Sequence, residues 1–151
     1  MIPGVNRETL QVEVKESLVI DSALIVDEAV PIQRKLLDIL HRAGFAASRV
    51  QMTADAESAM ELFVREHPGV VFAEFVGDDP EEGLAMVLEM LKLDPQARVV
   101  LVTAEPRDSA VVRRAVRMGA FAVVEKPVRH ETIRALLTDI NNEAGGIERF
   151  R

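Results

Sequence analysis

Five polar or charged side chains of this 151-residue chain stand at the ends of short apolar runs: Asp27, Glu28, Glu74, Thr103 and Lys126. If those runs are neighbouring parallel strands, their carboxyl ends meet at one edge of a sheet, where ligands bind in such folds. Three carboxylates that face one point repel each other unless a cation lies between them, and Mg²⁺ prefers carboxylate oxygens as ligands. A hydroxyl and an ammonium beside them can hold the oxygens of a phosphoryl group. The set therefore indicates phosphoryl chemistry or an imitation of it.

The elements that must position these side chains follow from the alternation of apolar runs with longer helical patterns. We predict strands at 23–26, 48–52, 70–73, 98–102 and 121–124. The intervening helices are predicted to begin at Pro31, at the capping residues Asp55, Asp79 and Asp108, and near Glu131. Such alternation is typical of a parallel sheet covered by helices on both faces. The sequence therefore predicts an α/β fold built from five strand–helix units.

Length and composition favour a single domain with one hydrophobic core. Of the 151 residues, 48% are hydrophobic and none is Cys, which excludes disulfide frameworks, thiol catalysis and Cys-ligated zinc. No apolar run approaches the roughly 20 residues of a membrane span. The first residues also lack the pattern of a signal peptide. We therefore expect a cytoplasmic protein that does not act at a membrane.

The predicted domain occupies residues 21–142 and leaves a segment at each end. Residues 1–20 form an N-terminal extension in which apolar and polar residues alternate over 10–15. This alternation is typical of an extra strand that adds to a sheet edge, and a tail that binds a partner is the alternative. Residues 143–151 include two adjacent glycines and are predicted to form a flexible C-terminal tail.

The order and spacing of four motifs resemble the receiver domain of bacterial two-component response regulators. The matching segments, between about Ser22 and Asn141, are Leu24-Ile25-Val26-Asp27-Glu28, Leu101-Val102-Thr103-Ala104, Met118-Gly119-Ala120 and Lys126-Pro127. The resemblance implies a flavodoxin-like (βα)5 doubly wound parallel sheet in three layers, with strand order 2-1-3-4-5. It implies signalling through protein contacts in place of an enzymatic activity. It also implies a cis peptide bond before Pro127, as the family usually has there.

The resemblance assigns a role to each polar residue at the predicted sheet edge. In the family, an acidic pair, here Asp27 and Glu28, helps to hold Mg²⁺. An Asp at the end of the third strand accepts the phosphoryl group, and Thr and Lys, here Thr103 and Lys126, contact the transferred phosphate. A metal ion, where bound, would have the acidic pair, the acceptor residue and the backbone of Val76 as ligands.

The phospho-acceptor position is where this sequence departs from the family. Glu74 stands where the family has Asp, and the loop that follows is at least one residue longer. Glu reaches one C–C bond, about 1.5 Å, further than Asp, and a misplacement of about 1 Å can cost on the order of 100-fold in rate. The Glu74 carboxylate instead reaches toward the place of the phosphoryl oxygens, where it can pair with Lys126. In the fifth strand, Val123 replaces an aromatic residue that commonly reports phosphorylation.

We therefore expect an atypical receiver, or pseudo-receiver, that acts by protein–protein interaction largely independently of aspartyl phosphorylation. In this hypothesis Glu74 fixes an active-like state, Mg²⁺ binding is weak or absent, and no organic cofactor is needed. Two alternatives are also compatible with these residues. Glu74 can be a structural carboxylate without a regulatory role, or the protein can be a functional Mg²⁺-dependent phospho-acceptor that uses Glu74, Asp78 or Asp79. The loop acids are also expected to cap the next helix, because acids complement the dipole of a helix start.

Basic side chains are more frequent in the last third of the chain. Residues 99–151 hold 9 basic and 7 acidic side chains, whereas residues 1–98 hold 9 and 18. By analogy with the family, a docking face for a signalling protein, an output domain or a second copy is predicted on the fourth and fifth helices and the fifth strand, at Arg113, Arg114, Arg117, Val123 and Arg129. A solvated basic face is the alternative. The net charge of −7 and the absence of a recognition-helix module argue against direct nucleic-acid binding.

Overall fold

The computed structural model describes residues 20–142, which contain one five-stranded parallel sheet. The strands are β1 (Ala23–Val26), β2 (Val50–Thr53), β3 (Val70–Ala73), β4 (Val99–Thr103) and β5 (Ala122–Glu125). They lie in the order β2-β1-β3-β4-β5, and every neighbouring pair is parallel. The predicted flavodoxin-like topology is thus confirmed. The predicted N-terminal strand and C-terminal tail fall outside the described residues.

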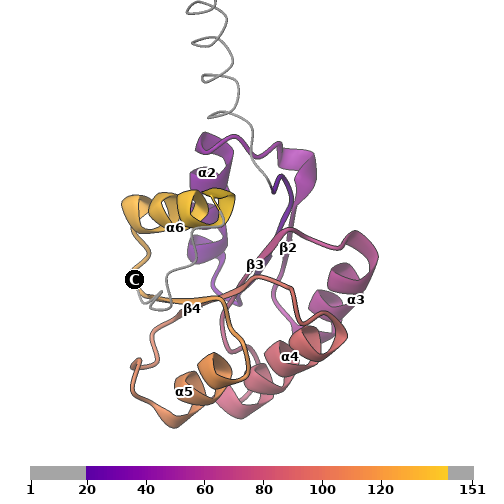
Figure 1. Ribbon diagram of the computed structural model, residues 1–151, viewed down its shortest axis with the longest axis vertical. Helices are drawn as coiled ribbons and strands as arrows, with labels where there is room; N and C mark the ends of the chain where they lie inside the picture. Colours follow the sequence, from indigo (N-terminus) through magenta and orange to yellow (C-terminus); the bar gives the residue numbers. More distant parts are fainter. Residues whose placement is uncertain (1–19, 143–151) are drawn as a thin grey trace, which may run out of the picture.

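Helices cover both faces of the sheet, so the domain has three layers (Figure 1). One face carries α2 (Val30–Arg42) and α6 (His130–Asn142). The other carries α3 (Ala56–Glu66), α4 (Pro80–Leu93) and α5 (Ala110–Arg117). None of these described helices is both long and apolar enough to cross a membrane. Because both faces of the central strands are covered, those strands are apolar without interruption.

Each face of the sheet contributes its own half of the core, because successive strand residues point to opposite faces. In β1, Ile25 packs with α2 and α6, whereas Leu24 packs on the side of α3, α4 and α5. Phe72 and Val71 of β3 divide in the same way, and all four side chains are at most 1% exposed. Full burial of such a side chain contributes about 1.5–3 kcal/mol. Burial on both faces of the sheet therefore stabilises the strands whose ends carry the predicted site.

The start of the second strand differs from the prediction. Ser48 and Arg49 were expected in the strand but form a 3₁₀ turn (Ala47–Arg49), and pairing with β1 begins at Val50. The amide of Arg49 donates to the carbonyl of Ala46 at 2.9 Å. Because of this local hydrogen bond, the amide of Arg49 does not pair with β1. The apolar pattern of the sequence alone does not reveal the turn.

Helix caps agree with the sequence prediction in two cases and differ in a third. Asp55 and Asp79 cap α3 and α4 as predicted. The prediction that Asp108 caps α5 is wrong, because Ser109 fills that position and its hydroxyl accepts a hydrogen bond from the amide of Val112 at 3.4 Å. Asp and Ser are equally good N-cap residues. Because Asp108 and Ser109 are adjacent, the sequence alone does not decide at which of them α5 begins.

Candidate functional site

Backbone hydrogen bonds beyond the strand ends set the positions of the site residues. The amides of Asp27 and Glu74 donate to carbonyls of neighbouring strands, and the amide of Lys126 donates to the carbonyl of Thr103, at 2.9–3.1 Å. Asp27 therefore follows β1, Glu74 follows β3, and Thr103 is the last residue of β4. All four residues lie at the carboxyl edge of the sheet, where the sequence places them.

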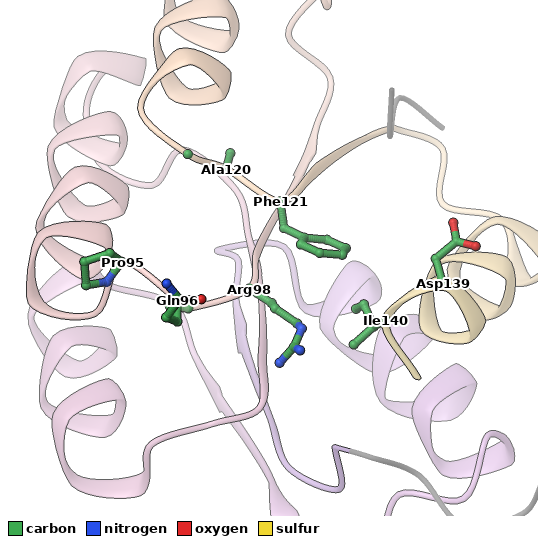
Figure 2. Close-up of a pocket in the computed structure, with 9 residues that line it drawn as sticks. Pro95, Gln96, Arg98, Ala120, Phe121, Asp139 and Ile140 are labelled. Atoms are coloured by element: carbon green, nitrogen blue, oxygen red, sulfur yellow. The ribbon is translucent and has the colours of Figure 1, made fainter. Parts of the chain in front are cut away.

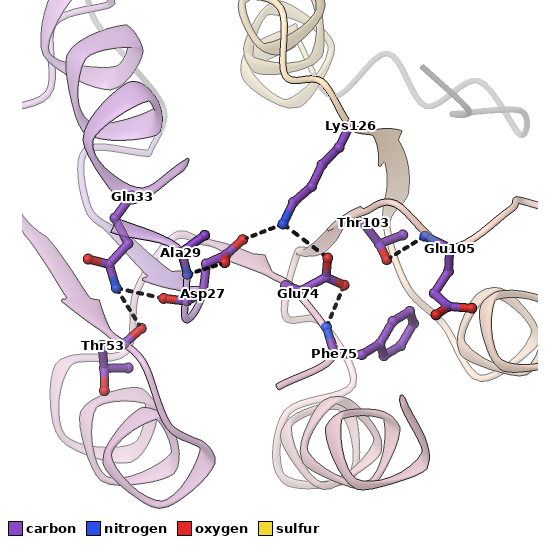
Figure 3. A network of polar contacts seen from close by, with 9 residues as sticks. All are labelled: Asp27, Ala29, Gln33, Thr53, Glu74, Phe75, Thr103, Glu105 and Lys126. Atoms are coloured by element: carbon purple, nitrogen blue, oxygen red, sulfur yellow. Dashed lines mark hydrogen bonds and ion pairs between the residues drawn. The ribbon is translucent and has the colours of Figure 1, made fainter. Parts of the chain in front are cut away.

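The ammonium of Lys126 lies between two carboxylates (Figure 3). Its Nζ is 2.9 Å from Oδ2 of Asp27 and 3.1 Å from Oε2 of Glu74. The side chain of Asp27 is 4% exposed, and the side chains of Lys126 and Glu74 are each 18% exposed. The residue after β5 therefore bridges the residues after β1 and β3. The peptide bond that follows, Lys126–Pro127, is cis.

The two carboxylates favour the charged form of Lys126. Burial lowers the pKa of its ammonium, but hydrogen bonds and Coulombic attraction from Glu74 and Asp27 outweigh that effect. The pKa of Lys126 is therefore raised above its ordinary value of 10.5. Lys126 is thus a permanent cation throughout the neutral pH range.

Both carboxylate oxygens of Glu74 are engaged. Oε1 accepts a hydrogen bond from the amide of Phe75 at 2.7 Å, while Oε2 pairs with Lys126. A backbone amide and an ammonium are donors that hold phosphoryl oxygens in proteins. The Glu74 carboxylate therefore occupies an environment that suits a phosphoryl group.

Asp27 is held by contacts that include a residue the sequence analysis did not single out. Oδ1 of Asp27 accepts a hydrogen bond from the amide of Ala29 at 2.8 Å. Gln33 of α2 donates through Nε2 to the carbonyls of Asp27 and Thr53, at 2.7 and 3.2 Å. Gln33 thus ties the ends of β1 and β2 together. It belongs to no motif in the sequence, so only the fold reveals its role.

The second member of the acidic pair, Glu28, has a different partner. Its Oε1 accepts a hydrogen bond from the amide of Gly77 at 3.2 Å, which links the β1–α2 loop to the β3–α4 loop. Gly77 has φ of +116°, a conformation that favours glycine. In this structure Glu28 therefore connects two loops and does not join the contact between Asp27 and Lys126.

The residues in this arrangement do not fit a Mg²⁺ ion. Mg²⁺ requires oxygen ligands at about 2.0–2.1 Å in octahedral geometry. The carboxylates of Asp27 and Glu74 instead converge on a nitrogen, and Glu28 contacts Gly77. Within residues 20–142, no three Asp, Glu or His side chains are grouped to hold a metal ion. The ligand set implied by the resemblance, which adds the backbone of Val76, is therefore not assembled here.

An acidic cleft lies beside the site. Thr103 is fully buried, and its Oγ1 accepts a hydrogen bond from the amide of Glu105 at 3.0 Å. Next to it, a cleft of about 230 Å³ opens between the β3–α4 and β4–α5 loops. Among the residues that line it, the charged ones are all acidic: Glu74, Asp78, Asp79 and Glu105. A cleft with this lining repels an anionic phosphoryl donor.

The acids of the β3–α4 loop also serve the start of α4. Oδ1 of Asp79 accepts a hydrogen bond from the amide of Glu82, and the Glu82 carboxylate accepts from the amides of Asp78 and Asp79. This is a capping box, which satisfies amides that the helix leaves without partners. The capping interpretation of Asp79 is thus confirmed.

Gly83 lets α4 approach the loop after β3 closely. A Cβ atom at this position would lie 2.3 Å from Cα of Phe75 and 2.6 Å from the amide nitrogen of Val76. The amide of Phe75 is the one that donates to Glu74. In the sequence, Gly83 matches a glycine that usually follows the acceptor position in the family that the chain resembles, and an isolated glycine inside a helical pattern is by itself a weak signal of a packing requirement.

The basic residues predicted for docking are exposed. Arg113 and Arg117 are exposed on α5, and Arg129 is exposed just before α6. Arg114 is exposed too, but it forms an ion pair with Glu81 of α4 at 2.7 Å. The exposed surface around α5 therefore carries cationic groups, one of which already has a partner within the domain.

The prediction that Val123 belongs to the docking face is wrong. Its side chain is 1% exposed and belongs to the core between the sheet and helices α3, α4 and α5. The alternation along β5 points Val123 into this layer, whereas Ala122 and Val124 point into the other. A partner that contacts the surface cannot reach Val123.

A second cavity lies at the opposite, amino-terminal edge of the sheet (Figure 2). It measures about 280 Å³ and is lined by the segments before β4 and β5 and by the last turns of α6, including Gln96, Arg98, Phe121 and Asp139. It shares no lining residue with the cleft beside Glu74. The two cavities are therefore separate features of the domain.

Comparison with known proteins defines the class of this chain. The family model of the response regulator receiver domain matches residues 23–138. This match includes all five strands and most of α6. The chain therefore belongs to the response regulator receiver domain family, which acts in two-component signalling.

Several relatives share this sequence pattern. The chain is 29% identical over 104 residues to protein CcdB of Bacillus subtilis, covering 69% of this chain and 83% of that protein. It is 24% identical over 118 residues to the chemotaxis protein CheY of Thermotoga maritima, covering 78% of this chain and 95% of CheY. The chain thus spans most of the length of these relatives.

Solved structures show the same fold. A CheY-like receiver domain protein from Methanospirillum hungatei matches with a TM-score of 0.68 and 24% identity, covering 82% of this chain and 98% of that one. NtrX of Brucella abortus matches with a TM-score of 0.67 and 26% identity, covering 82% of this chain and 26% of NtrX. The chain thus spans about a quarter of the length of NtrX.

Proposed function

We propose that this protein is an atypical receiver, a pseudo-receiver, that signals through protein contacts largely independently of phosphorylation at the acceptor position. The observation that carries the proposal is the environment of the Glu74 carboxylate. One oxygen accepts from the amide of Phe75, and the other pairs with Lys126. Both donors suit a phosphoryl group. Glu74 thus supplies a permanent negative group where a typical receiver acquires one, and it holds the site in an active-like arrangement.

Glu74 is a poor phospho-acceptor in this arrangement. Each oxygen of the Glu74 carboxylate already contacts a donor, the amide of Phe75 or the ammonium of Lys126, and this contact lowers its nucleophilicity. The extra methylene group of Glu also moves the carboxylate by about 1.5 Å from the place of an Asp, and about 1 Å of misplacement can cost on the order of 100-fold in rate. The acidic lining of the adjacent cleft disfavours an anionic donor as well. All three effects oppose phosphoryl transfer.

The first prediction concerns phosphorylation by a small molecule. We expect no added phosphate on the native protein after incubation with acetyl phosphate and Mg²⁺, as measured by intact mass. We expect the Glu74→Asp variant to gain one phosphate, because the shorter side chain releases Lys126 and returns the nucleophile to the place that the family uses.

The Glu74→Gln variant is the matched control, because it keeps the size of Glu but lacks the nucleophilic carboxylate. It should remain unmodified under the same conditions. A phosphate on the native protein that maps to Glu74, Asp78 or Asp79 would contradict the proposal. It would support a functional Mg²⁺-dependent phospho-acceptor instead.

The proposal includes the class of partner and the setting. We infer a cytoplasmic signalling role for the unit formed by residues 21–142, with a signalling protein or an output domain as partner. The match to one segment of the longer NtrX chain supports an output domain as one such partner class. The exposed Arg113, Arg117 and Arg129 favour a partner with an acidic surface. The same face is the proposed contact for a homodimer.

The second prediction tests this face. Arg113→Glu combined with Arg117→Glu is expected to weaken association with an acidic partner at least about tenfold, because both changes place an acid opposite the acidic surface of that partner. Pull-down from cell extract and analytical ultracentrifugation measure the effect on a partner and on a homodimer. Arg34→Glu with Arg42→Glu on α2 is a control of equal charge change on the other side of the sheet. Equal association of the native protein and the α5 variant would show that this face is only a solvated basic surface.

A further inference from the structure

We infer that Lys126 serves as a tethered cation in place of a metal ion, so that the acidic edge of the sheet excludes divalent cations while this ammonium is present. The inference deepens the proposed function and rests on it, since a site that transfers no phosphoryl group needs no metal for that step. Its basis is a disagreement between the ligand set that the family resemblance implies and the contacts that these residues make.

The two most buried acids of the site already share a cation. Oδ2 of Asp27 and Oε2 of Glu74 lie 2.9 and 3.1 Å from the same nitrogen of Lys126. Oδ2 of Asp27 is fully buried, and apart from the ammonium of Lys126 it has no polar partner among the described residues. Carboxylates this close repel each other when nothing neutralises them. The position between them therefore requires a positive charge, and Lys126 supplies it.

A divalent ion must compete with this ammonium at a disadvantage. Lys126 is the residue after β5, so the chain itself fixes the effective concentration of its ammonium at the site, whatever the composition of the solution. The third acid, Glu28, accepts a hydrogen bond from Gly77 and supplies no oxygen to this position. Only two carboxylates are thus available, and both are occupied.

The third prediction is a gain of metal binding when the ammonium is removed. Mn²⁺ is the probe, since it takes the same oxygen ligands as Mg²⁺ and its free form is counted directly by electron paramagnetic resonance. The native protein is expected to show no saturable binding up to about 5 mM Mn²⁺. Lys126→Met is expected to bind one Mn²⁺ at least about tenfold more tightly, since a single neighbouring cation already weakens the binding of a proton to a carboxylate by about 10- to 1000-fold.

Three variants complete the experiment. Lys92→Met removes the same charge at an exposed position of α4 and should behave like the native protein. Lys126→Met with Asp27→Asn should lose the gained binding. Lys126→Gln, which is neutral but retains a hydrogen-bond donor, is the second route if Lys126→Met does not fold.

Two results would overturn the inference. One is saturable Mn²⁺ binding by the native protein, and the other is the absence of any gain in folded Lys126→Met or Lys126→Gln. No phosphodonor is present, so the result stands apart from the phosphorylation test. A native protein that binds Mn²⁺ but accepts no phosphate would remove only the tethered-cation inference, whereas a phosphorylated native protein would remove the proposed function.

Discussion

Replacing Lys126 with Met is expected to lower the free energy of unfolding by about 3 kcal/mol at pH 7. The change leaves Asp27, whose side chain is 4% exposed, without its cation and next to a second carboxylate. Removing one partner of a buried ion pair costs about 3–5 kcal/mol. The lower end applies because Lys126 and Glu74 each keep 18% exposure. Urea denaturation followed by circular dichroism measures the loss.

Arg42→Met is the matched control for this prediction. Arg42 pairs with Asp38 at 3.2 Å, but both side chains are more than half exposed. Such a surface pair contributes only about 0–1 kcal/mol. Adding Glu74→Gln to Lys126→Met removes the second carboxylate and should recover part of the stability. A loss below about 1 kcal/mol in Lys126→Met would show that the bridge is no stronger than a surface pair.

The pH dependence of this contribution has a defined sign. The pKa of Lys126 is raised in the folded state, so proton binding favours folding. The contribution is complete below pH 10.5, the ordinary value, and is lost as the pH rises through the higher pKa of the folded state. The difference in stability between the native protein and Lys126→Met should therefore shrink above pH 10.5. The chain has no Tyr or Cys, so few other side chains titrate in that range.

Gly83→Ala is expected to destabilise the protein by about 1–3 kcal/mol or more, although helix propensity alone predicts a gain of about 1 kcal/mol. The added Cβ would lie 2.3 Å from Cα and 2.5 Å from the carbonyl carbon of Phe75. These are backbone atoms, so no side chain can rotate away. Either α4 or the loop after β3 must move, and the steric term therefore outweighs propensity.

The movement of α4 or of the loop after β3 should also disturb the candidate site. The amide of Phe75 donates to Glu74, so its NMR signal is expected to move in Gly83→Ala. Ala85→Gly, at an exposed position of the same helix, calibrates propensity and should cost about 1 kcal/mol without moving that signal. A stabilised Gly83→Ala variant would mean that α4 and the loop separate without cost.

Much of the fold and of the site follows from local features of the sequence. Apolar runs of four or five residues that end in Asp27, Glu74, Thr103 and Lys126 predict parallel strands, and the strand order 2-1-3-4-5 follows from the family resemblance that these motifs carry. Parallel strands bring such residues to one edge because their carboxyl ends coincide. Local signals were weaker at element boundaries. Asp108 and Ser109 are both good caps, and a backbone turn ending at Arg49 shortened the second strand.

Only the tertiary structure decided which way the side chains turn and what they contact. Asp27 and Glu28 are adjacent in the sequence, yet one meets Lys126 and the other meets Gly77. Val123 is an apolar residue that either layer could accept. The alternation along β5 directs its side chain toward α3, α4 and α5, where it is buried. Gln33 and Gly83 gained their roles from segments that lie beside them only in the folded chain. Residue type and spacing determined the position of each group along a strand, whereas hydrogen-bond partners depend on distances between strands and loops that exist only after folding.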